Sequence, residues 1–233
     1  EASTVKMPYV FIALALIALA LAIAMFNLPK IEATREFRPM GETDAAARDL
    51  WKQRQLILGA LGIFLYVGAE VAIGSFLINY FTQPEIGNLT VKVAAGLVSL
   101  YWFGAMIGRF IGAAVLQKLS TRTVLGTVAV VACLLVLTSM ASRGWLAMVT
   151  IILVGLFNSV MFPSIFSLGI EGLGPLTGKG SGLLVMAIVG GAIIPVAEGA
   201  LADHIGIHHA FILPALCYVY IAYYGFRGSV HAT

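Results

Sequence analysis

Residues 56–81 read LILGALGIFLYVGAEVAIGSFLINYF, and this stretch decides the class of fold. Glu70 is its one charged residue. A helix needs about 20 apolar residues to cross a hydrocarbon core roughly 30 Å thick, so the stretch is long enough to span a membrane. A soluble helix of this length carries polar residues along its water-facing side. The stretch therefore predicts a transmembrane helix.

Six further apolar runs accompany this stretch. They are Pro8–Leu28, Val91–Leu116, Val124–Ala141, Trp145–Leu168, Ser181–Leu201 and Ala210–Phe226. Over all 233 residues, 60% are hydrophobic and 11% are charged. Soluble domains carry about a quarter charged residues, so too few charges remain here to cover a water-facing surface. We expect an all-α integral membrane protein with seven transmembrane helices and the lipid bilayer as its solvent.

One connection between the runs is long and charged. Residues 29–55 mix basic and acidic side chains, whereas the other connections are short. If the loops alternate between the two sides of the membrane, most of the 14 Lys and Arg residues lie on the same side as this segment. The positive-inside tendency makes that side cytoplasmic, so the chain starts outside and ends in the cytoplasm. We predict a first helix within residues 1–28, a cytoplasmic linker over 29–55 and a six-helix bundle over 56–233.

Glu70 is the first candidate for function. A carboxylate deep in a membrane is costly unless it is paired, protonated or open to a water-filled cavity. Tyr66 lies four residues earlier and shares its face, whereas Ser75 and Asn79 point to the opposite side of an ideal helix. Because a straight helix cannot direct both faces at one cavity, we expect a bend in the helix at the pair formed by Gly74 and Ser75.

A second polar position lies in the fifth run. Asn158 and Phe162 are four residues apart, and Pro163 removes a backbone hydrogen bond to the carbonyl of Ser159. A polar amide beside a broken turn suits a hydrogen-bonding ligand. An Asn that only bonds a neighbouring helix is almost as common. If the first reading holds, Tyr66, Glu70, Asn79, Asn158 and Phe162 form one wall of a substrate site.

Arg109 is the third candidate. It lies about two turns from the predicted cytoplasmic end of its helix, too deep for an unpaired guanidinium. Glu171 ends the fifth run on the same side of the membrane. We expect an ion pair between them that joins two helices and acts, together with Glu70, in coupling or gating. The alternative is that Arg109 extends to lipid phosphate or to loop carbonyls.

Other patterns indicate packing or no function. Gly104, Gly108 and Gly112 form a small-residue stripe that favours close helix contact. No phosphate-binding loop, Gly-x-Ser-x-Gly or His-Glu-x-x-His motif occurs, and the histidines near residues 204–209 fit a solvated turn better than a metal site. The net charge of +3 gives no reason to expect nucleic acid. We expect no enzyme activity, no cofactor and no metal.

Several motifs resemble a known transporter family. The segment GRFIG at residues 108–112, followed by Lys118 and Arg122, resembles the cytoplasmic loop of the major facilitator superfamily in its second-half copy. The segments YVGAE at 66–70, GSFLI at 74–78, PSIFSLGI at 163–170 and GGAIIP at 190–195 resemble the fucose, glucose and galactose symporter family. The similarity covers nearly the whole chain, as helices six to twelve of that family.

This resemblance implies a twelve-helix fold of two halves, with one monosaccharide site between them and coupling to a proton or sodium. Residues 1–28 would then be the last helix of the amino-terminal half, and the rest of that half would be a partner of the bundle. The resemblance also implies a multi-pass protein of a bacterial inner membrane. Glu70 stands where the fucose transporter has an uncharged amide, which favours glucose or galactose as the substrate.

Two other classes of membrane protein are alternatives to a transporter. Seven helices with an outside amino terminus also describe membrane receptors. The second alternative is a membrane-embedded enzyme. The run Ala210–Phe226 contains no Lys that could bind retinal, which argues against a pigment. No triad or metal constellation supports an enzyme. A sugar transporter that moves its substrate by cation symport is therefore the favoured function.

Overall fold

The computed structural model describes residues 10–11, 13–14, 16–18, 21 and 50–229. The chain forms two compact units, Glu1–Thr43 and Asp44–Thr233. In the first unit the described residues are helical and exposed. The predicted run Pro8–Leu28 and the linker 29–55 lie largely outside the described residues. The count of seven helices and the three-part division therefore remain predictions.

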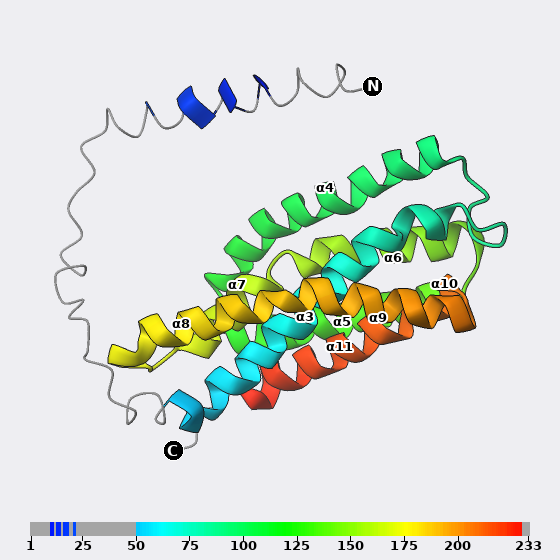
Figure 1. The fold of residues 1–233 in the computed structure, drawn as a ribbon. Coiled ribbons are helices and arrows are strands. Elements are labelled where there is room, and N and C mark those ends of the chain that lie inside the picture. The colour runs from blue at the N-terminus through cyan, green and yellow to red at the C-terminus, as the bar shows by residue number, and fades with distance from the viewer. Residues whose placement is uncertain (1–9, 12, 15, 19–20, 22–49, 230–233) are drawn as a thin grey trace. The chain divides into compact units, whose positions relative to one another are not determined.

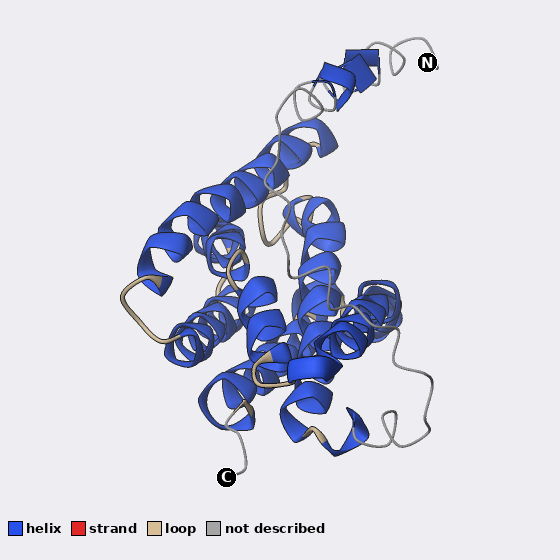
Figure 2. Cartoon of the chain, turned by 90° about the vertical axis from the view of Figure 1, so that its left-hand side faces the viewer, coloured by secondary structure: helices blue, strands red, loops and turns tan. Residues whose placement is uncertain are grey.

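The described part of the second unit consists of helices joined by short loops (Figures 1 and 2). The helices are α3 (Arg54–Phe81), α4 (Val91–Leu116), α5 (Thr121–Ala141), α6 (Gly144–Asn158), α7 (Met161–Ile170), η2 (Gly174–Leu176), α8 (Thr177–Met186), η3 (Ala187–Val189), α9 (Gly190–Ile205), α10 (Ile207–Ala210), α11 (Ile212–Tyr223) and the π-helical η4 (Tyr224–Gly228). In this part of the chain, six helical segments are long and apolar enough to cross a membrane. They coincide with the six predicted runs, so the all-α membrane fold is confirmed.

Helix α3 is the centre of the six-helix bundle. It contacts α4, α7, α9 and α11, while α5 packs against α6 and α11 (Figure 1). The spans differ in burial: 17% of the most apolar window of α4 is buried, against 56% for the span Gly144–Ile170. Helix α4 therefore presents most of its apolar side chains to its surroundings, among them Trp102, Phe103 and Phe110.

Glycines permit close contacts between helices. A Cβ atom at Gly108 would lie 2.0 Å from the backbone oxygen of Leu156, and one at Gly112 would lie 1.8 Å from Val160 Cγ1. Both distances are too short for any larger residue, so the predicted stripe is confirmed at these two positions. Gly104 is less crowded, since its nearest atom would be 3.6 Å away.

The two predicted helix irregularities have different outcomes. Helix α3 continues through Gly74 and Ser75 without a break in its assignment, so the bend expected there remains a prediction. The small residue also serves packing, because a Cβ atom at Gly74 would lie 3.1 Å from the ring of Trp102 on α4. The break before Pro163 is confirmed: α6 ends at Asn158 and α7 begins at Met161. Pro163 falls in the first turn of α7, where a missing N–H costs little.

Candidate functional site

A buried polar cluster surrounds the break between α6 and α7. Asn158 is 0% exposed, and its Nδ2 donates a hydrogen bond to the Tyr101 hydroxyl over 2.9 Å. The Tyr218 hydroxyl donates to Asn158 Oδ1 over 2.8 Å. These two bonds connect α6 to α4 and α11. In an apolar interior an amide must find such partners, because leaving a buried polar group unpaired costs about 1–3 kcal/mol.

The broken turn also provides a backbone acceptor. Asn158 is the last residue of α6, so its carbonyl lies where the helical hydrogen-bond ladder stops. The Tyr66 hydroxyl of α3 donates to this carbonyl over 3.0 Å. Four helices therefore meet at one residue, and Asn158 is enclosed by protein rather than open to a ligand. The alternative reading, in which this Asn bonds neighbouring helices, accounts for its observed contacts.

Glu70 and Phe162 lie at the border of this cluster. Glu70 is half-buried, interacts with the Tyr66 hydroxyl and lies within electrostatic range of Tyr101 and Tyr218. The ring of Phe162 is 6.4 Å from that of Tyr66 and is also half-buried. A carboxylate beside aromatic rings is a combination that suits a polyhydroxylated ligand, since hydroxyls donate to carboxylates. The structure thus brings four of the five predicted substrate residues together.

The fifth residue, Asn79, lies elsewhere. It is nine residues beyond Glu70 on a continuous helix, which corresponds to about 13 Å along the axis. Its side chain is exposed and lines a pocket of about 510 Å³ between the ends of α3 and α9, with Phe76, Gly199 and Asp203. Asn79 therefore faces this pocket and not the buried cluster around Asn158.

The predicted ion pair between Arg109 and Glu171 is not formed. Glu171 instead pairs with Arg122 at the start of α5, with a nitrogen to oxygen distance of 3.2 Å. The reason is the order of the helices, because the end of α7 lies beside α5 while α4 packs against α6. Arg109 is exposed, and its positive charge acts on Glu70. Arg109 therefore belongs to the surroundings of Glu70 rather than to a contact with Glu171.

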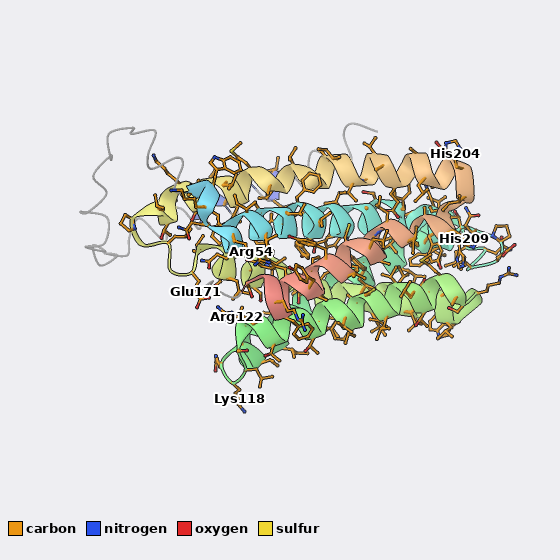
Figure 3. The ribbon with its side chains drawn as sticks, turned by 90° about the horizontal axis from the view of Figure 1, so that it is seen from below. Arg54, Lys118, Arg122, Glu171, His204 and His209 are labelled. Carbon is orange, nitrogen blue, oxygen red and sulfur yellow. The ribbon has the colours of Figure 1, made fainter. Side chains whose placement is uncertain are left out.

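Charged residues mark the two ends of the bundle. Figure 3 shows Arg54, Lys118 and Arg122 with Glu171 at one end, and His204 and His209 at the other. The side-chain amide of Gln55 donates to the backbone oxygen of Glu171, and this bond connects the start of α3 to the end of α7. The clustering agrees with the loop assignment from the sequence. Which end faces the cytoplasm remains a prediction.

Two groups of polar residues were not predicted from the sequence. Tyr101 and Tyr218 were not predicted as partners of Asn158, although a buried tyrosine normally needs a hydrogen-bond partner. At the far end of α3, the Tyr80 hydroxyl lies 2.9 Å from Ser139 Oγ and 3.2 Å from His208 Nδ1. His208 thus belongs to a hydrogen-bonded contact between α3, α5 and α10. The sequence did hold one signal for both groups: several of the predicted transmembrane helices carry a polar residue at a similar depth.

Comparison with known proteins gives a consistent result. Residues 2–189 match the Major Facilitator Superfamily. The chain is 47% identical over 229 residues to a glucose/galactose transporter of Brucella abortus, covering 98% of this chain and 55% of that protein. It is 33% identical over 220 residues to the L-fucose-proton symporter of Escherichia coli, covering 94% of this chain and 50% of that protein.

A solved structure shows the same arrangement of helices. A crystal structure of a variant of the Escherichia coli fucose:proton symporter superimposes with a TM-score of 0.86 and 32% sequence identity. The superposition covers 98% of this chain and 56% of that one. The chain thus spans about half the length of the curated relatives it matches. It belongs to the major facilitator superfamily.

Proposed function

We propose that this chain is the carboxy-terminal part of a secondary transporter that moves glucose or galactose across a bacterial inner membrane by cation symport. The observation that carries the proposal is the 47% identity, over 98% of the chain, to a glucose/galactose transporter. The lower identity of 33% to a fucose symporter favours glucose or galactose over fucose. Because the chain belongs to a transporter family, a transporter is favoured over the receptor and the enzyme.

The polar cluster supports this proposal by its chemistry. Glu70 lies at the border of a hydrogen-bonded cluster, beside the rings of Tyr66 and Phe162. Glu70 would accept hydrogen bonds from sugar hydroxyls, and the half-buried ring of Phe162 would cover an apolar face of the sugar. Asn158 would act indirectly, because its carbonyl accepts the hydrogen bond that holds Tyr66 in position. Asn79, at the end of α3, would contact the sugar only along its entry route.

The other half of the site would come from the amino-terminal half that the relatives possess. The exposed apolar side of α4 supplies a surface for that half or for lipid, because its aromatic residues have few partners within the described part of this chain. The basic end of the bundle would face the cytoplasm, which places the start of the chain outside. Arg109 would tune the charge of Glu70, and the pair of Arg122 and Glu171 would hold the cytoplasmic end closed.

Uptake by the complete transporter tests the proposal. Cells lacking other uptake systems should accumulate labelled glucose or galactose, in competition with each other and less with fucose. Glu70→Gln should reduce uptake about 10-fold or more, since hydrogen bonds from a sugar to a charged group contribute about 1.5–3 kcal/mol each. Its remaining uptake should depend differently on external pH or sodium. Glu85→Gln, which changes an exposed loop carboxylate, is the matched control. Normal uptake by Glu70→Gln at every pH and sodium concentration would remove Glu70 from the site.

A further inference from the structure

Helix α9 contains a second carboxylate at membrane depth. Glu198 is 0% exposed, and neither of its carboxylate oxygens has a hydrogen-bond partner. Its enclosure comes entirely from the described part of this chain, so it does not depend on another half of the protein. Glu70, by contrast, is half-buried and interacts with Tyr66. The two carboxylates therefore have different surroundings and need separate explanations.

Glu198 lies on the face of α9 that is pressed against α3. Gly190, Ile194 and Glu198 follow one another at intervals of four residues and are the buried residues of this helix. A Cβ atom at Gly190 would lie 1.9 Å from the backbone oxygen of Phe64, and one at Gly68 would lie 2.3 Å from Ile194. The contact is tight enough to exclude water from the same face one turn further along, where Glu198 lies.

No basic group in the described residues compensates this carboxylate. Helix α9 packs against α3, η3 and α10, and Glu198 also lies within electrostatic range of Cys217 on α11. The titratable and charged groups on these elements are Arg54, Tyr66, Glu70 and Tyr80 of α3, His208 and His209 of α10, and Cys217, Tyr218, Tyr220 and Tyr223 of α11; η3 has none, and α9 itself adds Asp203 and His204. Of these, the Cys217 thiol interacts with Glu198, and it cannot neutralise a negative charge.

An ionised carboxylate in such a place is far more costly than a neutral carboxylic acid. We propose that Glu198 holds a proton while α9 is packed against α3, and that it releases the proton when α9 moves, so that it acts as a second cation-coupling residue. The inference rests on the proposed function for its role in transport. On loading, a proton from water forms an O–H bond with a Glu198 oxygen. On release, that bond breaks and the proton returns to water on the other side.

The structure of α9 favours such a movement. The segment before it, η3, is a 3-10 turn, and Pro195 lies inside α9 three residues before Glu198. Proline removes the hydrogen bond to the carbonyl four residues earlier, that of Gly191, and weakens the helix at this point. No side-chain hydrogen bond between α3 and α9 is recorded within residues 50–229. Close packing, and no side-chain hydrogen bond, keeps Glu198 away from water. A modest displacement of α9 would therefore admit water to it.

Infrared spectroscopy of the purified, complete transporter tests proton binding without any sugar. The protein should show the C=O stretching band of a protonated carboxylic acid at neutral pH. Glu198→Gln should delete that band, Glu198→Asp should shift it, and Glu85→Gln should leave it unchanged. If Glu198→Gln does not fold, the shift in Glu198→Asp still assigns the band. Absence of a band that responds to either substitution overturns the proposal.

Transport assays test the coupling role. One proton moving down a potential of about 100 mV supplies about 2.3 kcal/mol, which corresponds to roughly 50-fold accumulation. Glu198→Gln mimics the protonated acid, so it should lose this accumulation of galactose while it still exchanges labelled for unlabelled galactose across the membrane. Accumulation equal to that of the unsubstituted protein would overturn the coupling role. If the unsubstituted protein transports no sugar at all, the proposed function fails, and the infrared result still decides whether Glu198 binds a proton.

Discussion

Helix α3 contacts its neighbours in two different ways. Toward α6 it reaches a hydrogen-bonded centre, where the Tyr66 hydroxyl donates to the carbonyl of Asn158 over 3.0 Å. Toward α9 it presents glycine and aliphatic surface, and Glu198 lies in that contact without a partner. Directional bonds fix the first contact in one geometry, whereas the second depends on close fit and permits sliding. The side of α3 toward α6 is therefore the more rigidly fixed one, and the side toward α9 is the one that our proposal for Glu198 requires to move.

The largest effect is expected at the contact between α3 and α9. Gly190→Val would place its Cβ atom 1.9 Å from the backbone oxygen of Phe64, and a backbone atom cannot give way as a side chain can. We expect a loss of about 3 kcal/mol or more of stability, which is the upper range for overpacking. The yield of folded protein and thermal unfolding in detergent measure this loss.

Gly182→Ala is the matched control for this substitution. It lies on α8, and no atom lies within 4 Å of the position of its Cβ. This control should leave the unfolding temperature unchanged or slightly higher, because alanine favours helices. Equal unfolding temperatures for Gly190→Val and the control would show that α9 is not held by this contact, and would contradict the comparison.

A smaller effect is expected at the polar centre around Asn158, where the side-chain amide of α6 bonds α4 and α11. Asn158→Leu removes the partners of Tyr101 and Tyr218 while keeping a side chain of similar size. We expect a destabilisation of about 1–3 kcal/mol, because two buried hydroxyls lose hydrogen bonds. Thermal unfolding of the variant measures it.

A double-mutant cycle sharpens this result. If the bond from Tyr218 to Asn158 carries part of the loss, Tyr218→Phe should cost less in the Asn158→Leu background than in the unsubstituted protein. Strict additivity of the two losses would mean that the amide is not a shared centre. In that case the contrast between a hydrogen-bonded centre at Asn158 and a shape-fitted contact at α9 would disappear.

The smallest effect on stability is expected at the exposed ion pair. Arg122 and Glu171 are 34% and 52% exposed, and such pairs contribute about 0.2–1 kcal/mol. Arg122→Glu and Glu171→Arg should each change the unfolding temperature little, and the combined exchange should restore the value of the unsubstituted protein. Thermal scans at low and high salt measure this, since salt screens exposed charges. A loss as large as that of Asn158→Leu would show that this end, too, belongs to the rigid frame.

Local signals in the sequence were sufficient for the helices themselves. The run Val91–Leu116 coincides with α4 at both ends, because length and hydropathy alone determine a span. The break before Pro163 was also predictable, since proline removes a backbone hydrogen bond from its own helical turn. The segment at residues 174–180 was missed as helix, because its glycines and Lys179 made it read as a loop.

Contacts between distant helices could not be predicted in this way. The role of Gly74 in packing depends on Trp102, which lies on another helix, so the sequence of α3 alone could not show it. The partner of Glu171 depends on whether α4 or α5 lies beside α7, and charge alone does not decide that. Asn158 was singled out from its position beside Pro163, but its bonds to Tyr101 and Tyr218 could be found only from the order of the helices in the bundle.

The position of Asn158 along the chain has a consequence for biosynthesis. Tyr66 and Tyr101 precede it by 92 and 57 residues, so both are made before it. Tyr218 follows it by 60 residues. During synthesis the amide nitrogen and the carbonyl can find their partners as soon as α6 enters the membrane, whereas the amide oxygen must wait for α11. Helix α11 therefore completes the polar centre, and the bundle reaches its full stability only after that helix has been made.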